Sequence, residues 1–393
     1  MDFNKQDTVL VTCARGIVPY LIKEAEGLGF SVESEHDTGI EIKATLNDTQ
    51  RLNLYLRTAF NVLYLLKKFT CRGPEELYRE INSIAWEEII DPKEYLSISS
   101  GTQSEHIKNA VFASQKAKDA IVDRLVKKCG SRPDSGAQRD NVVLNLYWKD
   151  DTCWLYLNTS GKKLSDRTYR KIPFKAPLQE TLAAAIIQAT GYDGSVPLVN
   201  PMCGSGTLAI EAALIALKRS PGLLRNNFGF MHVKGFDKEA WGKVRKAAHA
   251  GVLKKIAKPI IATDIDRKAI DAALKNAQTA GVESMIDFQV CDYRKTTVPK
   301  EQGIIVLNPE YGFRMGDEKK LETTYKDIGD FLKQRCSGYT GYIFTGNLNL
   351  GKKVGLRTSR KLIFYNARIE CRLLEYKMYE GTTKIKVSGC CLN

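Results

Sequence analysis

From residue 176 onward, short apolar segments alternate with segments of helical periodicity, and this pattern constrains the fold more than any other feature of the chain. The strand candidates are residues 196–199, 260–263, 286–290, 304–307 and 342–344. Strands separated by helices pair in parallel, so the pattern predicts a doubly wound α/β sheet. Two further candidates, 362–365 and 369–379, are joined only by a turn at Asn366. This last pair should therefore be antiparallel.

The first 159 residues have a different pattern, which predicts two small α+β units. Residues 1–50 read as strand, helix, strand and strand. The second unit has helical spacing over 51–69 with a β-like run at 63–66, and then helical periodicity over 75–90 and 109–129. A hairpin over 141–148 and 152–158 ends it. Residues 160–175 follow, with six basic side chains and one acidic one. They are either a linker that follows a phosphate backbone or a solvated tether.

The charge of the chain favours a polyanionic partner. Its formal net charge is +14, and neutralising phosphates releases condensed counterions. No apolar run reaches the roughly 18–20 residues that cross a bilayer, and the first eleven residues lack the pattern of a secretory signal. The ten cysteines include no C-x-x-C pair, and there are only four histidines. We therefore expect a cytoplasmic protein with reduced thiols, no metal site and no membrane partner.

Residues 197–207 contain the first motif that points to a ligand. They read Pro-Leu-Val-Asn-Pro-Met-Cys-Gly-Ser-Gly-Thr and lead from an apolar strand into a helix over 208–217. Glycines in such a turn let the backbone approach a ligand, and the free N–H groups at the helix start attract electron-rich atoms. The Gly-Lys-Ser/Thr ending of a phosphate loop is missing. Alone, this turn is only a weak sign of a nucleotide-type site.

Two aspartates follow later strands. Asp264 ends the strand over 260–264 and could accept hydrogen bonds from both hydroxyls of a ribose, or it could cap the helix over 268–280. It lies 58 residues after Gly206, a spacing that requires an insertion, and residues 221–242 supply one. Asp292 follows the strand over 286–290 and could accept from an adenine amino group or cap a turn.

Residues 304–314 read Ile-Ile-Val-Leu-Asn-Pro-Glu-Tyr-Gly-Phe-Arg and match what methylation of an exocyclic amine requires. The Asn308 side-chain oxygen and the Pro309 carbonyl can accept the amine hydrogens, and the Tyr311 ring can stack on the base. Alone, the segment would be a turn after a strand. Its position after the three preceding features favours the catalytic interpretation.

Together these motifs resemble the class I S-adenosylmethionine-dependent methyltransferases that carry a THUMP domain and methylate guanine N2 in RNA. Residues 114–123 resemble the THUMP helix, and residues 160–170 with 176–178 resemble the family's linker and first methyltransferase motif. Residues 200–207 resemble its Asp-Pro-Met-Cys-Gly-Ser-Gly-Thr motif, and the insertion with Trp241 resembles the family as well. The resemblance covers essentially the whole chain and is greatest to the bacterial large-subunit ribosomal RNA guanine-N2 methyltransferases.

The resemblance implies a class I methyltransferase fold over residues 176–393, with a mostly parallel seven-stranded sheet whose last strand is antiparallel. A ferredoxin-like unit over 1–50, a THUMP domain over 51–159 and a basic linker over 160–175 would precede it. The cofactor implied is S-adenosyl-L-methionine, and the partner is RNA, with ribosomal RNA favoured and transfer RNA possible. The oligomeric state is left open.

The resemblance also assigns roles to individual residues. Catalysis would involve Asn308, Pro309 and Tyr311. The cofactor would be bound by Pro177, Asn200, Pro201, Cys203, Gly204, Ser205, Gly206, Thr207, Asp264, Ile265 and Asp292. RNA would be bound by Lys116, Lys118, Lys163, Arg167, Arg170 and Arg314.

Two positions depart from the family pattern. Asn200 replaces the usual aspartate and removes a negative charge near the methionine amino group, and Glu310 replaces a proline in Asn-Pro-Pro-Tyr. We expect activity to be retained, since position 309 still offers its carbonyl. The alternatives are a transfer RNA methyltransferase, a DNA amino-methyltransferase, against which the THUMP-like half argues, and a non-catalytic RNA-binding or assembly factor.

Overall fold

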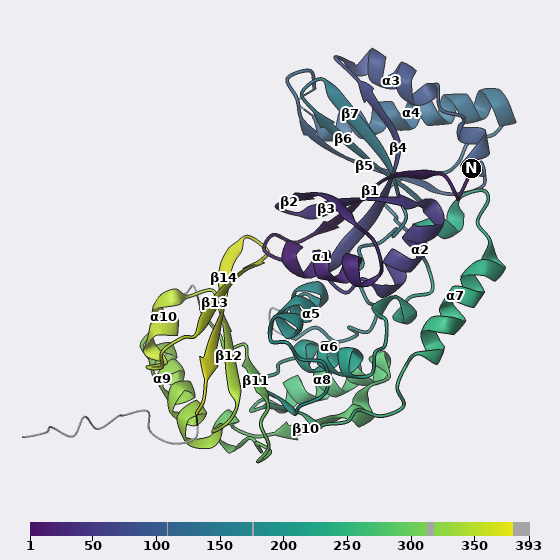
Figure 1. Ribbon diagram of the computed structural model, residues 1–393. Helices are drawn as coiled ribbons and strands as arrows, with labels where there is room; N and C mark the ends of the chain where they lie inside the picture. The colour runs from purple at the N-terminus through teal and green to yellow at the C-terminus, as the bar shows by residue number, and fades with distance from the viewer. Residues whose placement is uncertain (108, 175–176, 313–317, 380–393) are drawn as a thin grey trace, which may run out of the picture. The chain divides into compact units, whose positions relative to one another are not determined.

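The computed structural model describes residues 1–107, 109–174, 177–312 and 318–379 (Figure 1). The chain forms two compact units. Unit 1 comprises Met1–Arg170, Gln179–Ala185 and Lys218–Leu253, and unit 2 comprises Lys171–Leu178, Ile186–Leu217 and Lys254–Asn393. Each unit is therefore built from segments that are not contiguous in the sequence.

The strands described in unit 1 form one seven-stranded sheet in the order β2-β3-β1-β4-β7-β6-β5. All neighbours pair antiparallel except β5 and β6, which are parallel. The strands are β1 (Gln6–Cys13), β2 (Val32–His36), β3 (Gly39–Thr45), β4 (Ala59–Thr70), β5 (Leu96–Gln103), β6 (Val142–Lys149) and β7 (Thr152–Asn158). Strand β4 pairs with both β1 and β7, so the ferredoxin-like and THUMP parts share a single sheet.

The helix expected from residue 51 ends at Tyr55, and the β-like run expected over 63–66 lies within a longer strand. Helix α2 (Leu46–Tyr55) is capped by the Thr45 side chain, and the long strand β4 follows it. The β4 segment is rich in aromatic and branched residues such as Phe60, Val62 and Tyr64, which fit a pleated, half-buried surface. The expected boundary at residue 50 falls inside α2.

The other helices of unit 1 agree more closely with the sequence pattern. They are α1 (Val18–Gly27), α3 (Pro74–Asn82), the 3₁₀ turn η1 (Trp86–Glu88) and α4 (Ala110–Cys129). The helix expected over 75–90 is thus shorter and ends before η1. Helix α4 begins where the Asn109 side chain accepts from the Val111 N–H, at 2.9 Å, and ends at Gly130 with φ +71°. Helices α3 and α4 lie side by side (Figure 1).

Residues 218–253, which include the insertion expected from the sequence, belong to unit 1. They form η2 (Pro221–Leu224), η3 (Gly229–His232) and α7 (Lys238–Ala250). The rings of Phe228 and Phe230 stack at 5.3 Å, and Trp241 packs edge-on against Phe230 at 5.0 Å. A Cβ added to Gly229 would lie 2.2 Å from the Asn158 carbonyl oxygen, so only glycine fits there.

The segment after β7 is held in place by side chains of unit 1. The Arg225 guanidinium donates to the carbonyl oxygens of Ser160 and Lys163 at 3.0 and 2.9 Å. Burial lowers the pKa of Arg225 to about 10, which still leaves it charged at neutral pH. These contacts show that residues 160–167 are a packed part of unit 1 and not a solvated tether.

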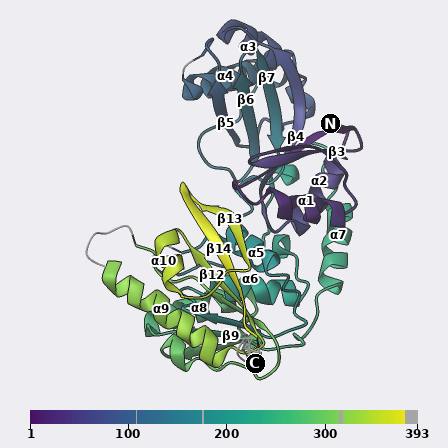
Figure 2. The same cartoon turned by 60° about the vertical axis from the view of Figure 1, so that its left-hand side comes forward.

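The strands described in unit 2 form a second seven-stranded sheet in the order β10-β9-β8-β11-β12-β14-β13 (Figure 2). The strands are β8 (Leu198–Pro201), β9 (Ile260–Asp264), β10 (Ile286–Val290), β11 (Ile304–Leu307), β12 (Thr340–Thr345), β13 (Arg360–Asn366) and β14 (Ile369–Lys377). Strands β8 to β12 pair in parallel, whereas β14 is antiparallel to both β12 and β13. This confirms the sheet and the final antiparallel pair expected from the sequence.

Helices and short 3₁₀ turns connect these strands. They are α6 (Thr207–Ala216), α8 (Arg267–Ala280), η4 (Glu283–Met285), η5 (Tyr293–Lys295), α9 (Glu318–Arg335) and α10 (Leu348–Lys353). Helix α5 (Glu180–Ala189) precedes β8, and its residues up to Ala185 belong to unit 1. A core of fully buried side chains, including Val199, Ile305 and Ile328, packs between the sheet and α9. The carboxyl ends of β8, β9 and β11 therefore lie on a rigid platform.

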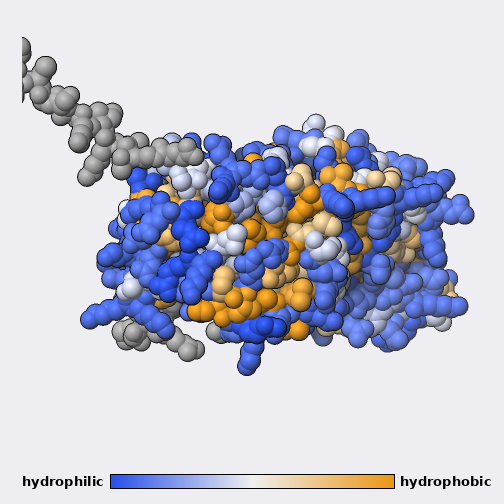
Figure 3. Space-filling view, turned by 90° about the horizontal axis from the view of Figure 1, so that it is seen from below, coloured by the Kyte–Doolittle hydropathy of each residue, from blue (hydrophilic) through white to orange (hydrophobic). Residues whose placement is uncertain are grey.

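On the face drawn in Figure 3, many of the side chains are hydrophilic. Figure 3 shows that apolar side chains also gather in a patch on the face seen from below. Within the described ranges, none of the helices is long and apolar enough to cross a membrane.

Candidate active site

The glycine turn after β8 is hydrogen-bonded to strand β9. The Cys203 N–H donates to the Thr263 carbonyl oxygen at 3.0 Å, and the Gly206 N–H donates to the Cys203 carbonyl oxygen at 2.9 Å. Gly206 has φ +81°, and a Cβ there would lie 2.9 Å from the Ala273 Cβ. Gly204 has φ +54°, and a Cβ there would meet no atom within 4 Å. The turn therefore needs both glycines and leaves open space above Gly204.

Asp264 is directed at this turn. One of its carboxylate oxygens accepts from the Gly204 N–H and the other from the Asp266 N–H, both at 3.0 Å. The N-cap of α8 is Asp266, whose side chain accepts from the Lys268 N–H at 2.9 Å. Asp264 is therefore not the helix cap. Its carboxylate is only partly buried and stabilises the glycine turn, and its remaining lone pairs can accept further hydrogen bonds.

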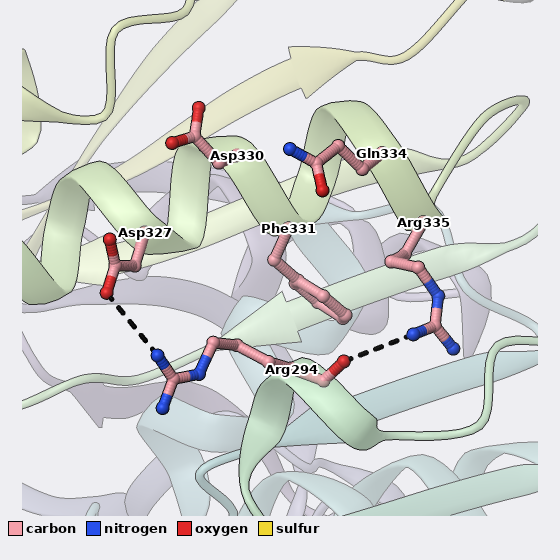
Figure 4. A pocket seen from close by; sticks show the side chains of 6 residues that line it. All are labelled: Arg294, Asp327, Asp330, Phe331, Gln334 and Arg335. Carbon is pink, nitrogen blue, oxygen red and sulfur yellow. Dashed lines mark hydrogen bonds and ion pairs between the residues drawn. The ribbon is translucent and has the colours of Figure 1, made fainter.

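Asp292 caps η5, as the second interpretation of this residue expected. Its carboxylate accepts from the backbone N–H of Arg294 at 2.9 Å and from the guanidinium of the same residue at 2.7 Å. The hydrogen bond from Arg294 holds the pKa of Asp292 below its usual value. Arg294 also lies 3.7 Å from Asp327, and the two line a shallow pocket on α9 (Figure 4). None of the residues assigned to the cofactor lines that pocket.

Asn200 joins the two central strands at the level of the glycine turn. Its side chain is fully buried, and its Nδ2 donates to the Val306 carbonyl oxygen at 2.8 Å. A carboxylate could not donate this hydrogen bond, which gives a physical reason for the departure from aspartate. The Oδ1 atom of Asn200 is buried and has no hydrogen-bond partner among the residues described.

Residues 308–311 follow β11 directly, beside the turn that follows β8. Asn308 is half-buried, and its Oδ1 atom is buried without a hydrogen-bond partner in the described part of the chain. Pro309 is buried, and Glu310 is exposed. The Tyr311 hydroxyl accepts from the Asn366 side chain at 2.9 Å. The structure thus brings an unused amide acceptor and an anchored aromatic ring to the same strand end.

Burial, with Asp264 nearby, raises the pKa of the Cys203 thiol. This residue is therefore neutral at ordinary pH, and its thiol is not an activated nucleophile. Within the described ranges, there is also no group of His, Cys, Asp and Glu side chains that could hold a metal ion.

The remaining cofactor assignments fall into two classes. Pro201, Ser205 and Thr207 are buried in the strand end and the start of α6, so they shape the turn. Pro177 is exposed, and the Ile265 side chain, directly after Asp264, is 71% exposed. Ile265 therefore offers an apolar surface beside the aspartate that could cover a flat ring.

Asn276 was not identified from the sequence. It lies within α8 and is fully buried, and its Nδ2 donates to the Ser205 and Ile172 carbonyl oxygens at 3.2 and 3.1 Å. Its Oδ1 accepts from the Lys171 N–H at 2.8 Å. Asn276 therefore ties the glycine turn to the segment that enters unit 2. A buried polar residue on an otherwise small-residue helix face was the only signal.

Several residues assigned to RNA binding have structural roles in unit 1. Arg167 is 1% exposed and its guanidinium donates to the Arg57 carbonyl oxygen, so this burial contradicts its assignment to an RNA-contacting surface. Arg170 is mostly buried against Glu180, at 2.8 Å. Lys116 pairs with the Glu75 carboxylate at 2.7 Å.

Two other basic residues remain accessible. Lys163 is exposed, and Lys118 is partly exposed. Arg314 lies outside the described residues.

Comparison with known proteins agrees with this geometry. Residues 167–375 match the RMKL-like methyltransferase domain, residues 8–63 the RlmL ferredoxin-like domain and residues 71–158 the THUMP domain. The chain is 33% identical over 368 residues to a putative RNA methyltransferase of Synechocystis, a match that covers 94% of this chain and 96% of that protein.

A second relative is longer. The chain is 35% identical over 373 residues to the ribosomal RNA large subunit methyltransferase K/L of Methylococcus capsulatus, a match that covers 92% of this chain and 50% of that protein. The chain thus spans about half the length of the K/L relatives it matches.

Among solved structures, a putative methyltransferase, SMU.472, complexed with SAH superposes with a TM-score of 0.87 at 25% identity, over 97% of this chain and 100% of that chain. The order of the unit 2 strands, the glycine turn and the matched domains all indicate a methyltransferase. The chain therefore belongs to the family of methyltransferases that carry an RMKL-like methyltransferase domain preceded by RlmL ferredoxin-like and THUMP domains.

Proposed function

We propose that this protein transfers a methyl group from S-adenosyl-L-methionine to the exocyclic N2 amine of a guanine in structured RNA, with 23S ribosomal RNA as the first candidate. The observation that carries the proposal is the buried, unpartnered Oδ1 atom of Asn308. It lies at the end of β11, next in the sheet to the strand that bears the glycine turn. A buried acceptor without a partner is costly unless a ligand satisfies it.

The residues present fit S-adenosylmethionine. The space above Gly204 admits the methionine part, and the unpartnered Oδ1 of Asn200 is an acceptor suited to its ammonium group. Asp264 would accept from the ribose hydroxyls, and Ile265 would cover the adenine ring. Asp292, already paired with Arg294, would contribute its remaining acceptor capacity. The similarity to SMU.472, which was solved in complex with SAH, supports this assignment.

The mechanism assigned to this chain consists mainly of positioning. The bound cofactor supplies an electrophilic methyl group. Asn308 Oδ1 and the Pro309 carbonyl oxygen would accept the two amine hydrogens, so that the nitrogen lone pair is directed toward the methyl carbon. Tyr311 would stack on the base and keep it out of the helix. The nitrogen forms a bond to carbon as the carbon–sulfur bond breaks, and the extra proton then leaves to water.

Unit 1 would bind the RNA by shape and phosphate contacts, as suits A-form helices. The matched THUMP domain and the names of the K/L and Synechocystis relatives support RNA as the partner class. Lys118 and Lys163 are the assigned basic residues that remain accessible. Ribosomal RNA in preference to transfer RNA, and a cytoplasmic site of action, are part of the proposal.

The test is tritiated methyl transfer from S-adenosylmethionine into deproteinised ribosomal RNA and, separately, into transfer RNA, followed by nucleoside analysis. We expect label in N2-methylguanosine from ribosomal RNA. Label found only in transfer RNA would show that the substrate is transfer RNA and not ribosomal RNA. Label in methyladenosine would show that the target base is adenine and not guanine. Cofactor binding without transfer to any RNA, including assembling ribosomal particles, would favour a non-catalytic RNA-binding factor.

The Asn200 contact gives a separate prediction. Substitution of Asn200 by aspartate should destabilise the protein at pH 7 by about 3 kcal/mol, because a buried carboxylate would face the Val306 carbonyl oxygen without a partner. Burial should raise the pKa of the new carboxyl above its unfolded value. The penalty should therefore shrink as the pH falls toward about 4, where the protonated carboxyl can donate. Chemical denaturation at several pH values measures it.

S-adenosylmethionine should stabilise this variant more than the wild type, since its ammonium group would pair with the new carboxylate. Asn349→Asp, at an exposed position of α10, is the matched control and should show neither effect. Equal stability of Asn200→Asp and wild type at pH 7 would show that the contact to Val306 is unimportant.

A further inference from the structure

The aromatic ring assigned to base stacking is held by a hairpin far from it in the sequence. Asn366 is the last residue of β13, where the chain turns into β14. Its Nδ2 donates to the Tyr311 hydroxyl oxygen at 2.9 Å. Strands β12 and β14 lie between β11 and β13 in the sheet, so this contact spans the sheet edge above them. Both side chains are half-buried.

A second contact limits the ring from the side. Gly346 directly follows β12, and a Cβ built on it would lie 3.0 Å from both Cδ2 and Cε2 of Tyr311. A Cβ at that distance would make an unusually tight contact, so the ring or the equally close Ile369 side chain would have to move by a few tenths of an ångström. The Phe344 ring meets Tyr311 edge-on, with centroids 6.5 Å apart at 80°. The ring is thus confined by a backbone, a ring and a hydrogen bond from three different residues.

These contacts mean that the ring is placed before a base arrives. An unanchored tyrosine on a loop would have to lose rotamer freedom when it stacks, and a small error in its position would displace the amine from the methyl donor. Burial raises the pKa of the Tyr311 hydroxyl, so the group remains neutral at the pH of any methyl-transfer assay.

We propose that Asn366 is a positioning residue for methyl transfer: it holds the Tyr311 ring, through the tyrosine hydroxyl, in the orientation in which the ring stacks on the target base. This proposal rests on the proposed function. Asn366 itself would touch neither the base nor the cofactor. Its effect should therefore appear in the rate of the chemical step and not in the affinity for either substrate.

The test is a double-mutant cycle with Asn366→Ala, Tyr311→Phe and the double variant. Tyr311→Phe keeps the ring but removes the hydroxyl that accepts the hydrogen bond. Each single variant should lower kcat by about 10-fold with little change in KM for RNA or S-adenosylmethionine. The double variant should be no slower than Tyr311→Phe, because that change already removes the contact with Asn366, together with the interaction between the hydroxyl and the Cys371 side chain.

Two further variants keep the test independent of folding defects. Asn366→Asp should retain most of kcat, since the tyrosine hydroxyl can donate to the new carboxylate. Gly346→Ala should lower kcat, because its methyl group would press on the Tyr311 ring and on the Ile369 side chain of the hairpin, both 3.0 Å away. Asn349→Ala, an exposed asparagine on α10, is the matched control and should behave as wild type. Thermal unfolding and cofactor binding by calorimetry check that every variant is folded.

The outcomes separate the two proposals. A wild-type protein that transfers no methyl group to any RNA would overturn both the proposed function and this inference. An active wild type would leave the function intact, and the inference alone would fall if Asn366→Ala had the wild-type kcat. It would also fall if the two single effects multiplied in the double variant, or if Gly346→Ala were as active as wild type.

Discussion

Replacing Asn308 with alanine should lower the rate of methyl transfer by about 100-fold or more, the effect that one preorganised polar contact at a reacting group typically has. The Oδ1 atom of Asn308 is buried, and no described residue satisfies it. In the proposed mechanism, it would accept a hydrogen of the substrate amine. Without it, one amine hydrogen loses its acceptor and the nitrogen lone pair is no longer directed at the methyl carbon. The affinity for S-adenosylmethionine should not change.

Steady-state methyl transfer and calorimetric cofactor binding, measured on the same preparations, check this prediction. Asn308→Asp keeps an acceptor oxygen in place and should be intermediate, while Asn349→Ala should match wild type. A rate for Asn308→Ala above about a tenth of the wild-type rate would remove Asn308 from the mechanism.

Substitution of Asp264 by alanine should weaken S-adenosylmethionine binding by about 100-fold, equivalent to about 2.7 kcal/mol. Two hydrogen bonds from ribose hydroxyls to a carboxylate contribute about 1.5–3 kcal/mol each, so this expectation is conservative. The same change also removes the acceptor for the Gly204 N–H and so loosens the glycine turn. Isothermal titration with S-adenosylmethionine measures the affinity directly.

Asp266→Ala is the matched control, because it removes a nearby carboxylate that has a different role. Asp266 caps α8, so its replacement by alanine should lower the free energy of unfolding by about 1 kcal/mol. The affinity for S-adenosylmethionine should not change. Thermal unfolding and titration together separate the two effects. If both variants bound the cofactor equally well, Asp264 would not contact the ribose.

Much of unit 2 was predictable because its strands are buried on both faces. Such strands appear as continuous apolar runs, for example 260–264 and 304–307. A candidate site residue ends the first of these strands, and another directly follows the second. The glycine turn was predictable too, since a short motif specifies its backbone conformation. Asp264 ends β9 and Asn308 follows β11, so the two expected site residues lie at strand ends on either side of β8.

The misses have a common physical cause, which is that local patterns do not encode distant contacts. Only the part of strand β4 over 63–66 was predicted, because apolar residues on both faces of a long strand can imitate helical spacing. Strand β5 went unnoticed because it is rich in serine and glycine. The sequence suggested that Arg167 is an exposed cation, whereas the structure shows that it is buried and donates to the Arg57 carbonyl oxygen. Asn366 and Asn276 likewise act on partners far along the chain.

The discontinuity of unit 1 also bears on how the protein is made. Its segment 218–253 is synthesised only after β8 and α6 of unit 2. A nascent chain grows by about 5–20 residues per second, and domains usually fold as units in the order of synthesis. Here the N-terminal sheet cannot acquire Arg225 or the Phe230 cluster until that segment has left the ribosome. During this interval, the newly made chain would expose surfaces that the finished protein covers, and these are the surfaces that a ribosome-associated chaperone would protect.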